Sequence, residues 1–141
     1  MKQQVYSKEA TVPWVVTIAL GCGFLLGCEV PLSEVAGSVL INGKPAPPGL
    51  KIVFQPQREG AEPILSATDY KGRYQLIHRS GKTGIAAGTY VVSLGLWGEA
   101  AENPPELAAI KIPERYRTGS STLECVVGRT ATTFDIDIRA D

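Results

Sequence analysis

Residues 68–78, Thr-Asp-Tyr-Lys-Gly-Arg-Tyr-Gln-Leu-Ile-His, combine a tight turn with an alternating strand. Asp69 can accept hydrogen bonds from the backbone N–H groups that follow it, and Gly72 can adopt the left-handed conformation that closes such a turn. Tyr74 and Leu76 then share one face, while polar residues alternate with them on the other. A period of two is typical of a β-strand with one buried face.

The same alternation recurs in short runs on both sides of this hairpin. We expect seven strands, over residues 34–41, 50–55, 64–68, 73–78, 89–97, 122–127 and 133–139. Asn42-Gly43 is a strong turn signal between the first two, because both residues tolerate positive φ. Residues 98–121 form the longest irregular stretch, with room for single helical turns at 106–110 or 113–116. No amphipathic helix is evident, so the pattern predicts an all-β domain over 34–141, a seven-stranded antiparallel β-sandwich.

One face of each strand is apolar and should form the core between the two sheets. The residues expected to point inward include Val35, Val39, Ile52, Phe54, Tyr74, Leu76, Tyr90, Val92, Leu94, Leu123, Cys125, Val127, Phe134, Ile136 and Ile138. About 110 residues are enough to bury such a core.

The N-terminal segment has the plan of a signal peptide. Lys2 and Lys8 lie in a polar start, and from Ala10 to Cys28 the chain carries no charge over 19 residues. Leu25-Leu26-Gly27-Cys28 resembles the bacterial lipobox, in which a cysteine is lipidated and the chain is cleaved before it. We therefore expect a signal peptide over 1–27, cleavage between Gly27 and Cys28, lipidation of Cys28 and a short tether over 28–33.

Two other interpretations of this segment stay open. The uncharged run is long enough to span a bilayer as an uncleaved helix, although Thr17 and several glycines make it a mediocre span. It could also be a buried helix. Cys22 matches the lipobox less well than Cys28, because Ala19 occupies the place of the leucine.

Composition limits the classes of function. The chain of 141 residues has 14 basic and 14 acidic side chains, and removal of residues 1–27 leaves 12 basic and 13 acidic ones. A near-neutral domain argues against nucleic-acid binding, which depends on many phosphate contacts. The predicted domain over 34–141 keeps only Cys125, which cannot form an internal disulfide. Cysteine together with the single His78 is too little for a metal site.

The order of the motifs resembles carboxypeptidase regulatory-like domains. Residues 35–45 match the opening strand and turn of that family, residues 68–74 match its "T-D-x-x-G-x-Y" hairpin, and residues 87–92 match its "P-G-x-Y-x-V" strand, with Ala87 in place of proline. The tail, residues 112–116, 121–123 and 133–138, is similar to short planctomycete lipoproteins built on this domain. The resemblance implies a transthyretin-like (prealbumin-like) sandwich and supplies no catalytic residue.

Single residues give little indication of chemistry. His78 is expected to be a structural residue at a strand end, with a ligand or base role as the alternative. Asp135 and Asp137 are expected on the polar outer face of the last strand rather than at a cation, Asp69 in its turn, and Cys125 in the core as a small hydrophobe. Residues 116–120 superficially resemble the ending of hydroxyisourate hydrolases, but the histidines of that active site are missing.

An exposed aromatic edge is the one candidate binding site. Trp97, Tyr116 and the Pro104-Pro105 loop could bind a glycan or a peptide, or Trp97 could cover one end of the core. Taken together, the sequence predicts a non-enzymatic lipid-anchored module outside the cytoplasm, at the outer membrane or the periplasmic face of the envelope. Its predicted partners are the membrane, through Cys28, and an envelope glycan or protein; we expect no cofactor, no catalytic residue and no metal.

Overall fold

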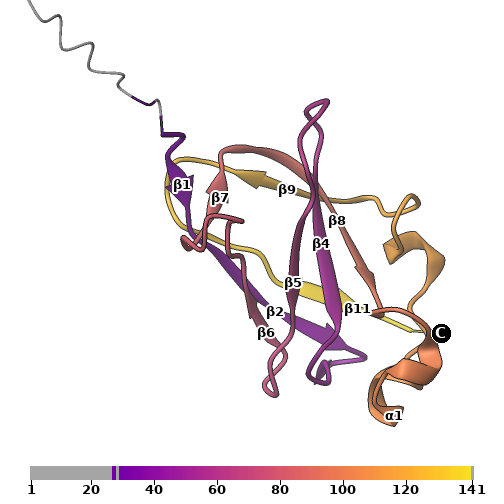
Figure 1. Cartoon of the computed structure of the whole chain (residues 1–141). Coiled ribbons are helices and arrows are strands. Elements are labelled where there is room, and N and C mark those ends of the chain that lie inside the picture. The colour runs from indigo at the N-terminus through magenta and orange to yellow at the C-terminus, as the bar shows by residue number, and fades with distance from the viewer. Residues whose placement is uncertain (1–26, 28, 141) are drawn as a thin grey trace, which may run out of the picture.

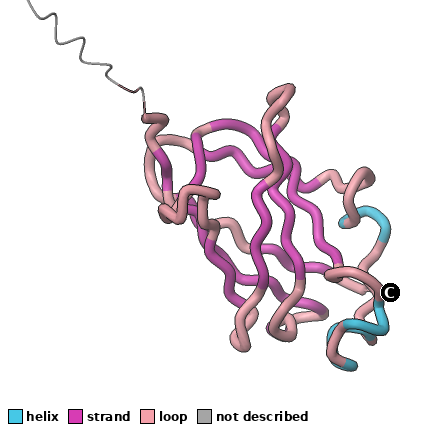
Figure 2. The backbone as a smooth tube through the Cα atoms, viewed as in Figure 1, coloured by secondary structure: helices cyan, strands magenta, loops and turns pink. Residues whose placement is uncertain are grey.

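The computed structural model describes residues 27 and 29–140, and residues 1–26 of the predicted signal peptide and Cys28 lie outside the described residues. Within this part the chain is mostly strands (Figures 1 and 2), as an all-β prediction requires. The strands are β1 (Leu32–Ser33), β2 (Val35–Ile41), β3 (Lys44–Pro45), β4 (Lys51–Pro56), β5 (Ile64–Ala67), β6 (Arg73–Gln75), β7 (Ile85–Ala86), β8 (Gly88–Gly95), β9 (Leu123–Val127), β10 (Thr132–Thr133) and β11 (Ile136–Ile138).

Three single helical turns interrupt the strands. They are η1 (Ala100–Glu102), α1 (Pro105–Ala108) and η2 (Glu114–Tyr116), all within the stretch predicted to be irregular. Buried Leu107 fixes α1 to the core. None of the helices between residues 29 and 140 is both long and apolar enough to cross a bilayer.

The first sheet is built around β2. On one side β2 pairs antiparallel with β6 and then with β3, and on the other side it pairs with β10 and β11. The last two pairings are parallel, with Ile136 opposite Val39 and Thr132 opposite Val35. The prediction of a purely antiparallel arrangement is therefore wrong at this edge. A parallel partner comes from a distant part of the chain, and strand alternation is the same whichever way the neighbour runs.

Residues 134–135, which link β10 to β11, are held against β2 and β6 by hydrogen bonds and by a close backbone approach. Between the pairings of β2 with β10 and with β11, the Ser38 N–H donates to the side chain of Asp135, at Oδ1, over 2.8 Å. Tyr74 Oη donates to the Phe134 carbonyl at 2.5 Å. A Cβ on Gly37 would lie 1.9 Å from the same carbonyl oxygen, so only glycine allows this close approach.

The second sheet has the order β5-β4-β8-β9, and all of its pairs are antiparallel. It faces the first sheet across one apolar core, and Phe54 of β4 lies 6.0 Å from Tyr74 of β6 between ring centroids. The predicted inward residues are buried or packed against this core, including Cys125 (2 % exposed). Burial also raises the pKa of the Cys125 thiol, which fits the prediction that it acts as a small hydrophobe.

The predicted 69–72 turn is present as expected. Asp69 Oδ1 accepts hydrogen bonds from the N–H groups of Lys71 (2.8 Å) and Arg73 (2.9 Å), and Gly72 has φ +72°. These hydrogen bonds lower the pKa of the Asp69 carboxyl, and the bond from the Arg73 N–H has the largest effect. Asp69 is therefore a turn former, as predicted.

Candidate binding cleft

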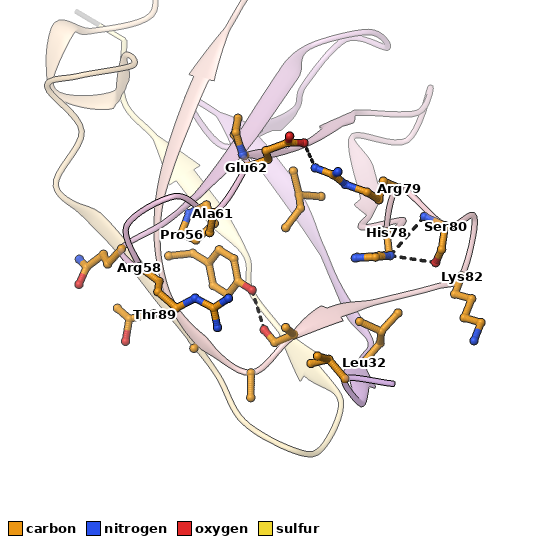
Figure 3. Close-up of a pocket in the computed structure, with 18 of the residues that line it drawn as sticks. Leu32, Pro56, Arg58, Ala61, Glu62, His78, Arg79, Ser80, Lys82 and Thr89 are labelled. Carbon is orange, nitrogen blue, oxygen red and sulfur yellow. Dashed lines mark hydrogen bonds and ion pairs between the residues drawn. The ribbon is translucent and has the colours of Figure 1, made fainter. Parts of the chain in front are cut away.

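A cleft of about 750 Å³ opens at the end of the domain where the chain enters from the tether (Figure 3). Its walls come from four segments that are distant in sequence: residues 29–32, the loop 56–64 after β4, the turn 78–82 after β6, and residues 86–90 at the start of β8. The volume lies within the range of about 300–1,000 Å³ that small-molecule sites usually occupy.

The tether wall is held by backbone pairing. Leu32 and Ser33 lie inside the predicted tether, but they form β1 and pair with Ala86 and Ile85 of β7. Ser33 Oγ also donates to the Gly128 carbonyl at 2.7 Å. Gly84 has φ +103°, and a Cβ there would lie 2.5 Å from the Ser33 carbonyl oxygen, so this pairing requires glycine.

The opposite wall carries His78 in the turn between β6 and β7. The strand predicted over 73–78 ends at Gln75, and His78 is half-buried at the cleft. Its Nδ1 accepts from the Ser80 backbone N–H at 3.2 Å and lies 2.8 Å from Ser80 Oγ. Because a backbone N–H can only donate, Nδ1 is the unprotonated nitrogen of the neutral ring and Nε2 carries the proton. Figure 3 shows the ring edge away from Ser80 pointing into the cleft.

Charged side chains surround the opening. Arg79 pairs with Glu62, and Lys82 pairs with Glu29, next to the predicted lipidation site. Both pairs are exposed, so each contributes little stability, but each neutralises a cation. Arg58 is the third cation that lines the cleft, and among residues 29–140 no carboxylate pairs with it.

The floor is apolar and firmly packed. Tyr90 is 4 % exposed, its ring lies 6.2 Å from that of Phe54, and its Oη donates to the Ala86 carbonyl at 2.6 Å. Burial raises the pKa of Tyr90, and the positive charge of Arg58 opposes that rise. Leu32, Pro56 and Ile64 add further apolar surface.

The predicted aromatic edge is elsewhere, at the end of β8. Trp97 is 42 % exposed, and Lys51 Nζ lies 5.6 Å from its ring centroid. Tyr116 in η2 is half-buried and packs against the core. A smaller hollow of about 320 Å³ lies between β8 and residues 110–118, and neither aromatic residue lines it. The structure thus does not join Trp97 and Tyr116 in one cavity.

The remaining polar candidates lie apart from the cleft. Asp135 and Asp137 are exposed on β11 and its approach, and Asp135 accepts from Ser38. The part of the chain that the structure describes brings no three His, Cys, Asp or Glu side chains together as metal ligands. The local Ser80–His78 contact is not continued to a carboxylate among these residues, so the cleft offers donors and apolar surface for binding.

Sequence reasoning missed most of the cleft residues. His78 stood out as the single histidine, and Arg79 and Lys82 follow it closely, but nothing in the sequence joined these residues to Arg58. The 58–60 segment, Arg-Glu-Gly, carries only the turn signal of Gly60, which has φ +72°. These side chains meet because the end of β4, the end of β6 and the start of β8 lie at the same edge of the domain.

We compared the chain with models of known protein families and with curated proteins. No family model matches the chain, and no curated protein matches it.

Proposed function

We propose that this chain is a non-enzymatic, lipid-anchored binding module of the bacterial cell envelope. The observation that carries the proposal is that the tether itself forms one wall of the cleft. Glu29 follows Cys28 directly, and consecutive Cα atoms are about 3.8 Å apart. Lipid on Cys28 would therefore hold the cleft at the membrane surface, outside the cytoplasm.

The fold type belongs to the same proposal. We propose a transthyretin-like sandwich of the carboxypeptidase regulatory-like kind. Support comes from two facing sheets with one core, and from the Asp69 hairpin and the strand beginning at Gly88, which both occur where the resemblance expects them. Fold alone supplies no function, so the binding role depends on the cleft.

The anchor is supported by sequence and by energetics. Leu25-Leu26-Gly27-Cys28 matches the lipobox, and Gly27 is exposed in the structure, where a protease could reach it. Each buried CH₂ of an acyl chain contributes about 0.8 kcal/mol, so two or more chains give stable anchoring. The acceptor membrane would be the outer membrane or the periplasmic face of the envelope.

Metabolic labelling tests the anchor. The wild-type chain and Cys22→Ala, the matched control, should both incorporate labelled palmitate in a bacterial host that processes lipoproteins. Cys28→Ala should incorporate none. The intact mass of the wild-type protein should correspond to a chain that begins at Cys28 and carries lipid. An unmodified chain that begins at Met1 would refute the anchor.

A second candidate site is the Trp97 edge, favoured by the exposure of that ring. An exposed indole suits a glycan or a peptide partner. Arrays of envelope polysaccharides and peptides test it: saturable binding that Trp97→Ala abolishes would favour this edge over the cleft.

A further inference from the structure

We propose that the cleft binds an amphiphile that carries one anionic group, a carboxylate or a phosphate, on an apolar body, with the anion between Arg58 and His78 Nε2. This inference rests on the proposed binding function and adds the class of ligand. It needs neither a metal nor a reaction step.

The first argument is the charge of the wall. Three cations and two carboxylates line the cleft, which leaves one net positive charge with His78 neutral. Arg79 and Lys82 are compensated by Glu62 and Glu29. The excess charge therefore belongs to Arg58, whose planar guanidinium can donate two parallel hydrogen bonds to a carboxylate or phosphate.

The second argument is the fixed donor on the facing wall. Ser80 engages His78 Nδ1 through both its backbone N–H and its hydroxyl, so the remaining N–H of the ring is Nε2–H. In Figure 3, Arg58 and His78 approach from opposite sides and both point inward. An anion between them would accept from two different segments of the chain.

The third argument is the surface below these donors. Leu32, Pro56, Ile64, Ala86 and Tyr90 provide apolar contact, and none of them offers an acidic group. The Tyr90 hydroxyl is already engaged with the Ala86 carbonyl. A ligand with a single polar end fits a cleft that has its donors on the walls and an apolar surface below them. The apolar part of such a ligand needs no hydrogen-bond partner on that surface.

Two sources could supply such a ligand. A lipid of the membrane that holds the anchor could present its phosphate and the start of its acyl chains to the cleft. A free acyl carboxylate or alkyl phosphate could also enter from the aqueous side. The shared chemistry is the same, and the experiment separates the two sources.

His78 is a built-in reporter because the chain has one histidine. The full chain, purified from membranes and labelled with ¹⁵N-histidine, is placed in phosphatidylcholine nanodiscs. Its single imidazole signal pair is followed by NMR while hexanoate, hexyl phosphate, hexanol or inorganic phosphate is added. Hexanoate and hexyl phosphate should shift the signals with saturation, and hexanol should bind about tenfold more weakly, because it lacks the charge-assisted hydrogen bonds.

Two variants locate the anion. Arg58→Gln should weaken the binding of hexyl phosphate about tenfold or more, while Arg73→Gln, which changes an exposed arginine away from the cleft, should leave it unchanged. Equal affinity of the wild type and Arg58→Gln, or of hexanoate and hexanol, would overturn the proposal. Far-UV circular dichroism of both variants establishes that they are folded.

Nanodiscs that contain phosphatidylglycerol identify the source. If they shift the His78 signals without any free probe, the ligand is a membrane lipid; if only the free probes do so, it is a soluble amphiphile. If neither shifts the signals, the ligand class is wrong. That result differs from failure of the anchor, which palmitate labelling of Cys28 reports separately.

Discussion

Replacement of Tyr74 by phenylalanine tests how β6 holds the β10–β11 link. The Tyr74 ring is 4 % exposed, and its hydroxyl donates to the Phe134 carbonyl. Loss of this bond leaves the part-buried Phe134 carbonyl without that donor and should cost about 1–3 kcal/mol of unfolding free energy at pH 7. Packing of the ring itself is retained, because phenylalanine fills the same space.

The cost should depend on pH in a defined direction. Burial, more than any nearby charge, raises the pKa of Tyr74 well above its usual value near 10. An acid with a raised pKa contributes stability that is present below its unfolded pKa and is lost as the pH rises. At pH 11 ionisation of an unfolded tyrosine with a pKa of about 10 stabilises the unfolded wild type by about 1.4 kcal/mol. The phenylalanine variant has no such term, so its deficit should be about 1.4 kcal/mol smaller at pH 11 than at pH 7.

Urea unfolding of the full chain in a non-ionic detergent measures this difference. Tryptophan fluorescence is followed at pH 7 and pH 11 for the wild type, Tyr74→Phe and Tyr70→Phe. Tyr70 is 78 % exposed, so its substitution is the matched control and should change little. A Tyr74→Phe deficit that is the same or larger at pH 11 would refute the reasoning, because it would mean that the phenol ionises in the folded state.

Two further substitutions test the turns and close contacts. Gly37→Ala would place a Cβ 1.9 Å from the Phe134 carbonyl oxygen and should lower the unfolding free energy by about 1–3 kcal/mol or more; Gly128→Ala, which meets no atom within 4 Å, is the control in the same urea titration. Asp69→Ala should lower the melting temperature at pH 7 and have a smaller effect near pH 3, because a carboxylate with a lowered pKa contributes stability above its unfolded pKa and loses it as the pH falls. Calorimetry that gives an equal Asp69 effect at both pH values would contradict this account.

Local features of the fold could be predicted from the sequence because neighbouring residues determine them. The Asp69 turn depends on a side chain and the two N–H groups close after it, and the inward positions of Phe54 and Tyr74 follow from alternation. The parallel neighbours of β2 could not be predicted in this way. Val39 and Ile136 are almost a hundred residues apart in the chain, and the register depends on the packing of Phe134 and Gly37.

The cleft is a product of this non-local arrangement. Arg58 follows β4, His78 follows β6 and Tyr90 lies in β8. The local sequence around each residue predicts only a loop, a turn or a strand, and not the shared site. His78 and Arg58 can be identified as parts of one site only when the structure shows them on facing walls of the cleft. Sequence could therefore indicate the fold class and the predicted anchor, while the site required three-dimensional structure.

The direction of β11 also places the end of the last strand far from the tether. Since β11 runs parallel to β2, the chain crosses the domain in the same direction on its last pass as on its first. β2 has seven residues, which rise about 3.3 Å each and so span about 20 Å. In Figure 1, β1 lies at one end of the domain, and the close of β11 lies near α1 at the other. With lipid on Cys28, the domain would act as a spacer: one end stays at the bilayer with the cleft, and the end with Ile138 and Trp97 extends into the surrounding space, within reach of a second partner.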